Sequence, residues 1–145
     1  MTRRMKLNEV FPAGYQAMLG LEQAVQASGI DKKLLELVKI RSSQINGCAF
    51  CLDMHTKDAR RLGETEQRLY TLSAWRDTPY FTPQERSLLA LVESITRISE
   101  HHVQDDVYNE AAKYFTTDQL AALIMAAITI NGWNRIAITT GMMPE

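Results

Sequence analysis

The sequence predicts an all-α protein, a compact bundle of about six to seven helices. Three observations lead to this prediction. Apolar residues recur every three to four positions along most of the chain, which is the period of an amphipathic helix. No run of alternating β-branched residues marks a strand, and no turn sequence lies between two strand-like segments. Capping residues and glycines divide the chain into segments of helical length.

The first three expected helices are separated by residues that end or begin helices. Ser28-Gly29 ends the first helix. Asp31 can cap the second, because its carboxylate accepts hydrogen bonds from the free N–H groups of the first turn. Asn46-Gly47 suits the left-handed conformation of a C-terminal cap. The expected ranges are about 8–27, 32–45 and 48–63.

Threonine caps mark most of the later helices. Thr65 can cap a fourth helix, and Thr116 or its neighbour can open the last one. Thr82-Pro83 with Glu85 is the strongest start signal, since it combines a capping hydroxyl, a proline at the first position and a glutamate at the third. The expected ranges are about 65–75, 83–99, 104–115 and 117–140.

The last expected helix is apolar on most of its sides, which is typical of a helix at the centre of a bundle or in a subunit interface. Its most apolar stretch, residues 120–130, is too short to span a bilayer, so we expect no membrane insertion. Asn131, Asn134 and Arg135 follow directly. We expect them to bond one another or the backbone of a partner.

Length and charge limit the classes of function. The 145 residues suit one domain, residues 1–145, and the net charge of −1 gives no electrostatic case for binding nucleic acid or an anionic membrane. No segment resembles an export signal, so we expect a cytoplasmic protein. Thiols are kept reduced in that compartment, where a close cysteine pair is more often catalytic, redox-active or metal-binding than a structural link.

Both cysteines lie in one short stretch, QINGCAFCLDMH, Gln44–His55. On a helix with about 100° per residue, Cys48, Cys51 and His55 share one inward face. The spacing brings the two sulfurs near enough for a disulfide, and the free N–H groups of the first turn favour a thiolate at Cys48. His55 follows Cys51 by four residues and is placed to take its proton. Cys51 is therefore the candidate nucleophile.

Two other interpretations of this motif stay open. The three side chains could simply be packing residues, because free cysteines are often buried. They could also bind structural zinc with a fourth ligand. The candidates for that ligand are Glu36, His101 and His102. We favour no metal, since there is no second Cys-x-x-Cys, and we expect both histidines of the His-His pair to face solvent.

The motif resembles that of a known family. Glu36, eleven residues, Cys48-Ala-Phe-Cys51, three residues and His55 reproduce the Glu-x11-Cys-x2-Cys-x3-His pattern of the alkylhydroperoxidase D (AhpD) proteins. These proteins belong to the carboxymuconolactone decarboxylase-like superfamily. Residues 72–96 and 129–142 also resemble segments of the short, single-domain members. In this chain we expect the cysteine pair to begin the third helix of the bundle.

The resemblance implies a thiol peroxidase without a cofactor. Cys51 would attack the peroxide, and Cys48 would resolve the intermediate. His55 would relay the proton, and Glu36 would orient His55 or act through it to deprotonate the thiol. The partners implied are a hydroperoxide substrate, an external reductant that is thioredoxin-like or lipoyl-bearing, and further copies of the chain in a trimer or hexamer. Decarboxylation is not expected, because the decarboxylases lack this cysteine pair. Phe50 stands where well-known members carry a second histidine.

Helical periodicity alone gives a different expectation for Glu36. The apolar stripe of its helix leaves Glu36 on the opposite side, where it would face solvent and pair with Lys32 or Lys39. A partly covered second face, against the third expected helix or a neighbouring subunit, would reconcile this position with the family pattern. Arg41 lies within the stripe, where it could either extend its guanidinium group to solvent or pair with an acid such as Asp53 or Glu85.

A second functional hypothesis is a non-enzymatic redox sensor or disulfide-exchange protein, in which the cysteine pair would switch an oligomer. In either case the position of Cys48 at the helix start predicts that its sulfur is the more exposed one.

Overall fold

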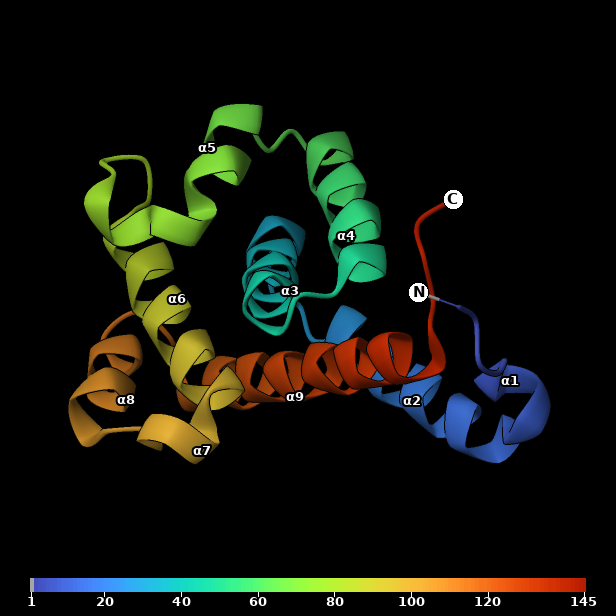
Figure 1. The fold of residues 1–145 in the computed structure, drawn as a ribbon. Coiled ribbons are helices and arrows are strands. Elements are labelled where there is room, and N and C mark those ends of the chain that lie inside the picture. Colours follow the sequence, from blue (N-terminus) through green and yellow to red (C-terminus); the bar gives the residue numbers. More distant parts are fainter. Residues whose placement is uncertain (1) are drawn as a thin grey trace.

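Helices arranged around one central helix make up the structure, a computed structural model that describes residues 2–145. The elements are α1 (Leu7–Val10), α2 (Pro12–Gln26), α3 (Lys32–Asn46), α4 (Ala49–Arg61), α5 (Glu66–Thr71), the 3₁₀ helix η1 (Leu72–Asp77), α6 (Pro83–Thr96), α7 (Ile98–His101), α8 (Asp105–Ala112) and α9 (Thr117–Thr140). Figure 1 shows α3 end-on at the centre, with α4, α5, α6 and α9 around it. The prediction of an all-α bundle is confirmed.

The described residues contain more helices than expected, because three expected helices are each divided in two. Pro12 begins α2 and separates it from the short α1, since proline has no N–H to continue the hydrogen-bond ladder. Ala74 lies at a non-helical kink within the 3₁₀ segment that follows α5. Arg97 ends α6 and is followed by the single turn of α7. The cysteine pair consequently begins the fourth helix in chain order, α4, rather than the third.

The predicted caps hold the helix ends. Asp31 accepts hydrogen bonds from the N–H groups of Lys33 at 2.7 Å and Leu34 at 3.4 Å. Thr82 and Glu85 form a reciprocal capping box at the start of α6. These caps satisfy N–H groups that the helices leave free, and they set where α3 and α6 begin.

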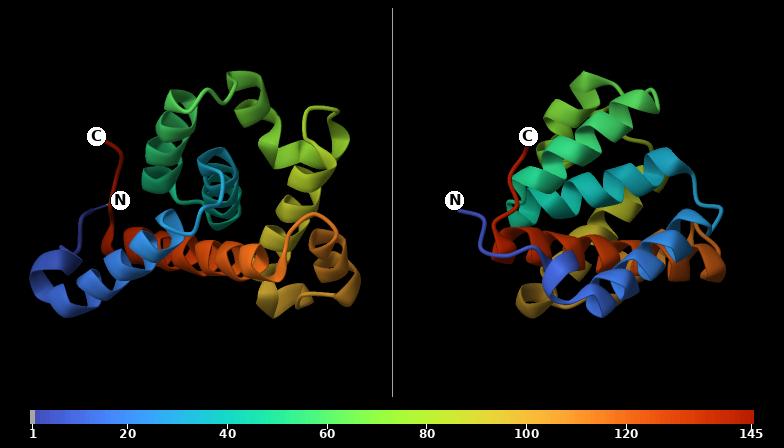
Figure 2. Two further views of the ribbon diagram at one scale, coloured as in Figure 1. Left: turned by 180° about the vertical axis from the view of Figure 1, so that it is seen from behind. Right: turned by 90° about the vertical axis from the view of Figure 1, so that its right-hand side faces the viewer.

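Helices α4, α3 and α9 lie in successive layers, which the right-hand view of Figure 2 shows from the side. One apolar cluster joins α3, α6, α8 and α9, and a second joins α3 to α4, η1 and α6. Residues 35–43 of α3 are all buried, so this helix has no solvent-facing side over that stretch.

Helix α9 is long and apolar enough to cross a membrane by length and composition, with a mean hydropathy of 1.3. It packs against α2, α3, α6 and α8, as expected of a core helix. Asn131 and Asn134 do not rely on each other for hydrogen bonds, because both accept from the side-chain amide of Asn46 at 2.9 Å. Asn134 donates to Ser43 Oγ at 2.9 Å, so a polar seam ties α9 to the end of α3. Arg135 donates to Asn131.

Of the two alternatives for Arg41, the structure has the pairing with an acid, but the acid is Glu93 of α6 and not Asp53 or Glu85. The Arg41 Nε atom lies 2.9 Å from Glu93 Oε1, which also accepts from the Trp75 indole at 2.8 Å. Burial by itself would raise the pKa of Glu93, but hydrogen bonds from Arg76, Trp75 and Arg41 lower it below its ordinary value.

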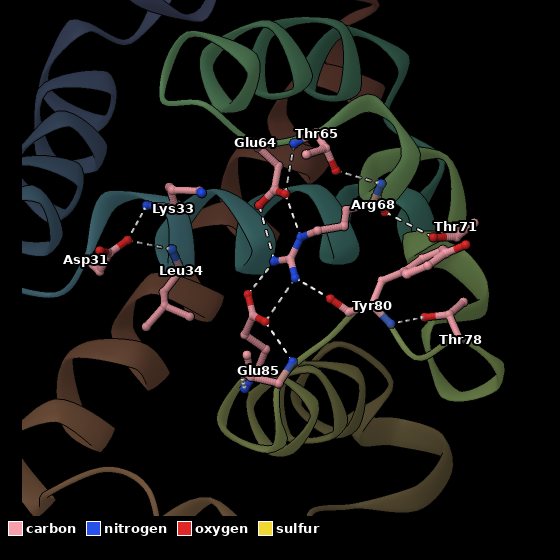
Figure 3. Close-up of polar contacts among 11 residues, drawn as sticks. Asp31, Lys33, Leu34, Glu64, Thr65, Arg68, Thr71, Thr78, Tyr80 and Glu85 are labelled. Carbon is pink, nitrogen blue, oxygen red and sulfur yellow. Dashed lines mark hydrogen bonds and ion pairs between the residues drawn. The ribbon is translucent and has the colours of Figure 1, made fainter.

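A second polar cluster joins α5 to α6 through Arg68 (Figure 3). The Arg68 guanidinium donates to Glu64 at 2.6 Å and to the Tyr80 carbonyl at 2.5 Å, and it pairs with Glu85. It also lies 4.6 Å from the centroid of the Phe81 ring. The hydrogen bond with Glu85 raises the pKa of Arg68 above its ordinary value. Glu64 is only 2% exposed, and among the described residues Arg68 is the cation that pairs with its carboxylate, which also accepts a hydrogen bond from the Thr65 N–H at 3.1 Å.

Substitution of Arg68 by methionine is expected to lower the free energy of unfolding by about 3 kcal/mol, because a buried carboxylate is left without its cation. Urea unfolding monitored by far-UV circular dichroism measures this loss. Lys57→Met is the matched control, since the Lys57–Asp53 pair lies on the surface with side chains 55% and 36% exposed. It should cost less than about 0.5 kcal/mol. Equal losses in the two variants would contradict the role given to Arg68.

Candidate active site

The turn between α3 and α4 places the two cysteines. Gly47 has a positive φ of 71°, which ends α3 in the left-handed conformation expected from Asn46-Gly47. Cys48 then caps α4, and its sulfur accepts a hydrogen bond from the N–H of Cys51 at 3.3 Å. The two residues form a disulfide with their Cα atoms 5.3 Å apart, as the spacing predicted.

Both sulfur-bearing side chains are buried, but they differ in what they face. Cys48 is 1% exposed and Cys51 is 2% exposed, and both pack against Ala137 of α9. Cys51 lines a pocket of about 750 Å³, whereas Cys48 is not among its lining residues. The expectation that Cys48 is the more exposed sulfur is therefore wrong. Its sulfur caps the first turn of α4, where it accepts the N–H of Cys51.

The pocket that Cys51 lines is formed by α2, α3, α4 and the end of α9. Much of its wall is apolar. The side chains that give it this character are Tyr15, Leu19, Phe50, Met54, Trp133 and Ile136. Phe50, at the position of the second histidine in well-known AhpD proteins, contributes an aromatic ring where those proteins have an ionisable one.

His55 and Glu36 meet in the same pocket. The Nδ1 atom of His55 lies 3.2 Å from Glu36 Oε2, and both side chains are about nine-tenths buried. Within residues 2–145 this is the one hydrogen bond of the imidazole, so the Nε2 atom has no hydrogen-bond partner there. Every fully buried side-chain nitrogen in those residues has a partner, and Nε2 is therefore not fully buried. The ring is thus held through one nitrogen and opens to the pocket through the other.

Glu36 does not face solvent, so the expectation from periodicity alone is wrong on this point. It is 7% exposed, because α4 covers the side of α3 that the apolar stripe leaves free. The expected partner Lys39 is nonetheless present, with its Nζ atom 3.7 Å from Glu36 Oε1. The two oxygens of one carboxylate therefore serve a lysine and a histidine separately.

A further acidic residue, Glu22 of α2, lies beside this group and was not predicted from the sequence. Its Oε1 atom lies 2.8 Å from Lys39 Nζ. Burial by itself would raise the pKa of Glu22, but the hydrogen bond and the charge of Lys39 lower it below its ordinary value, with smaller effects from Gln26 and His55. Only a pairing between helices distant in sequence reveals this residue, since no local spacing relates position 22 to the motif.

Cys48 and Cys51 are joined in a disulfide, so in this state their sulfurs are not available as the zinc ligands considered from the sequence. Glu36, His55 and Asp58 bring one ligand atom each to within 4.8 Å of the others. Lys39 and Arg61 already pair with these two carboxylates, so protein cations offset their charge. His101 and His102 are exposed in and after α7, on the opposite side of the molecule from α4 in Figures 1 and 2.

The sequence of this chain is similar to those of known proteins. The model of the carboxymuconolactone decarboxylase family matches residues 12–94, from α2 through most of α6. The uncharacterized protein YdfG of Bacillus subtilis is 43% identical over 141 residues, which cover 97% of this chain and 96% of that protein.

Two solved structures extend the comparison. A protein of unknown function from Agrobacterium tumefaciens, proposed as an antioxidant defence protein AhpD, superposes with a TM-score of 0.96 at 37% identity and 99% coverage of both chains. The debrominase Bmp8 shares the fold at a TM-score of 0.79 and 19% identity, covering 92% of this chain and 72% of its own. The chain therefore belongs to the carboxymuconolactone decarboxylase family, as an AhpD-like member.

Proposed function

We propose that the protein is a thiol peroxidase, which reduces hydroperoxides through Cys51 and Cys48 with His55 and Glu36 as the proton relay. The observation that carries this proposal is the shared pocket: of the two disulfide residues, Cys51 lines a space that His55 and Glu36 also line. A sulfur pair that can close, a base beside it and a wall suited to an organic group are the parts that the reaction needs.

The reaction begins with the reduced pair. The Cys51 thiolate attacks the distal oxygen of the hydroperoxide, the S–O bond forms and the O–O bond breaks, which leaves a sulfenic acid and an alkoxide. His55 supplies the proton that turns the alkoxide into an alcohol. The Cys48 thiol then attacks the sulfenic sulfur, and the departing hydroxide takes a proton and leaves as water. Two thiols are thereby oxidised to the disulfide, and one peroxide is reduced.

Glu36 orients the relay in this scheme. Its carboxylate accepts the hydrogen bond from Nδ1–H of His55, so in the neutral ring Nε2 carries the lone pair and faces the pocket. The same contact stabilises the charged ring after it has taken the thiol proton. The apolar wall around Cys51 supports organic hydroperoxides as the substrate.

The proposal includes a cytoplasmic location and assembly into a homo-oligomer, a trimer or hexamer, with an external dithiol as reductant. A redox sensor without rapid turnover is the alternative, and it would oxidise slowly with one peroxide consumed per protein. The similarity to the debrominase is one of fold, and no feature of the pocket described above favours a brominated substrate.

Cys51→Ser is expected to abolish hydroperoxide consumption, because no other described cysteine lines the pocket. Cys48→Ser should still consume one equivalent of cumene hydroperoxide and then stop at the sulfenic acid of Cys51. Peroxide loss, free thiols and a dimedone adduct found by mass spectrometry follow these steps together.

The control for Cys51 is the order of alkylation in reduced wild-type protein. Iodoacetamide should label Cys51 before Cys48, since only Cys51 borders the pocket. Full turnover in Cys51→Ser with none in Cys48→Ser would reverse the two assignments. Wild-type protein that consumes a single equivalent in the presence of an effective reductant would favour the sensor.

The reductant is expected to be a slender dithiol. Because the cysteines are only 1% and 2% exposed, a dithiol must enter the pocket to reach Cys51, which a lipoyl arm can do more readily than a dithiol on a folded thioredoxin-like surface. For each reductant, stopped-flow measurement gives the rate of reduction of the native disulfide divided by the rate on the protein unfolded in urea. This ratio should be at least about tenfold larger for dihydrolipoamide than for reduced thioredoxin. Equal relative rates would contradict this access argument.

A further inference from the structure

We propose that Glu22 and Lys39 are positioning residues, a charge pair that sets how strongly Glu36 holds a proton on the His55 ring. This inference rests on the proposed function for its catalytic meaning, but the electrostatic coupling that it describes can be measured without turnover. It concerns two residues outside the Glu-x11-Cys-x2-Cys-x3-His pattern.

The geometry is a chain of alternating charges that crosses three helices. Glu22 of α2 lies 2.8 Å from Lys39 Nζ, and Lys39 lies 3.7 Å from Glu36 Oε1. The other oxygen of Glu36 lies 3.2 Å from His55 Nδ1 on α4. The Lys39 side chain is 5% exposed, so water screens these charges weakly.

The unequal distances decide what Lys39 does. Its hydrogen bond goes to Glu22, whereas its contact with Glu36 is an ion pair without a hydrogen bond. Glu22 therefore holds the ammonium group back from Glu36, and one Glu36 oxygen remains available for His55. Without Glu22 the cation would be shared only with Glu36, and it would oppose a positive charge on the imidazole more strongly.

The other ionisable groups that line the pocket do not belong to this series of alternating charges. They are Arg3 of the N-terminal segment, Tyr15 of α2, Lys32 of α3, and Asp58 and Arg61 of α4, and α9 contributes none to the lining. Asp58 pairs with Arg61 at 2.6 Å, and Lys32 donates to Gln26. The closed disulfide removes both cysteines from titration.

The test is an NMR titration of the His55 ring in the oxidised protein. Glu22→Gln removes a negative charge and should move the titration midpoint to lower pH, while Lys39→Met removes a positive charge and should move it to higher pH, each by about half a unit. Lys39→Arg should stay near wild type, and the double variant should lie between the two single variants. His101 and His102 are exposed internal controls and should not move.

Opposite signs are the signature of electrostatic positioning. Midpoints that move in the same direction, or not at all, in variants whose circular dichroism and melting match wild type would overturn the inference. If one single variant does not fold, the other variant and the double variant still decide the sign. In the reduced enzyme, the pH profile of cumene hydroperoxide turnover should shift with the His55 midpoint. Absence of turnover in the wild type would overturn the proposed function and leave the titration result standing.

Discussion

The enclosure of α3 is the constraint on which the rest of the structure depends. Nine consecutive residues of this helix are buried, and several of them are polar or charged. A buried polar group costs free energy unless it finds a partner, so each of them has to be met by a neighbouring helix. Glu36 meets His55 of α4, Arg41 meets Glu93 of α6, and Ser43 meets Asn134 of α9. Among residues 2–145 no buried side-chain nitrogen or oxygen is left without a partner.

The candidate site follows from the same enclosure. The polar contacts that satisfy α3 also fix α4 against it, and a glycine turn leads from one helix to the other. Cys48 and Cys51 therefore lie at a helix start whose position is set by the packing of α4 against α3. A relay built between packed helices keeps its geometry better than one built on loops, because the surrounding side chains restrict its rotamers.

Local features of the fold could be predicted from the sequence, and features that depend on distant helices could not. Asp31, Thr82 and Glu85 were assigned correctly as caps, because a cap depends on residues within one turn. Pro12 was passed over as a helix start inside a longer periodic stretch.

An argument from periodicity assumes that a helix has one solvent-facing side, and α3 has none over residues 35–43. Periodicity alone therefore placed Glu36 in solvent, whereas the resemblance to the AhpD pattern indicated His55 as its neighbour. Glu93 as the partner of Arg41, and Glu22 beside Lys39, are pairings across 52 and 17 positions that no local pattern encodes.

The oxidised geometry also bears on how the proposed cycle returns to its start. Cys48 caps α4 while it is bonded to Cys51, so the helix keeps its first-turn hydrogen bond in the disulfide state. Glu36 and His55 keep their contact in that state as well. When a dithiol attacks Cys51, Cys48 leaves as a thiolate, and the N–H of Cys51, which already donates to the Cys48 sulfur, can stabilise its charge. In the proposed cycle, Glu36 and His55 thus serve the attack on the peroxide, and the first turn of α4 serves the return of the disulfide to two thiols.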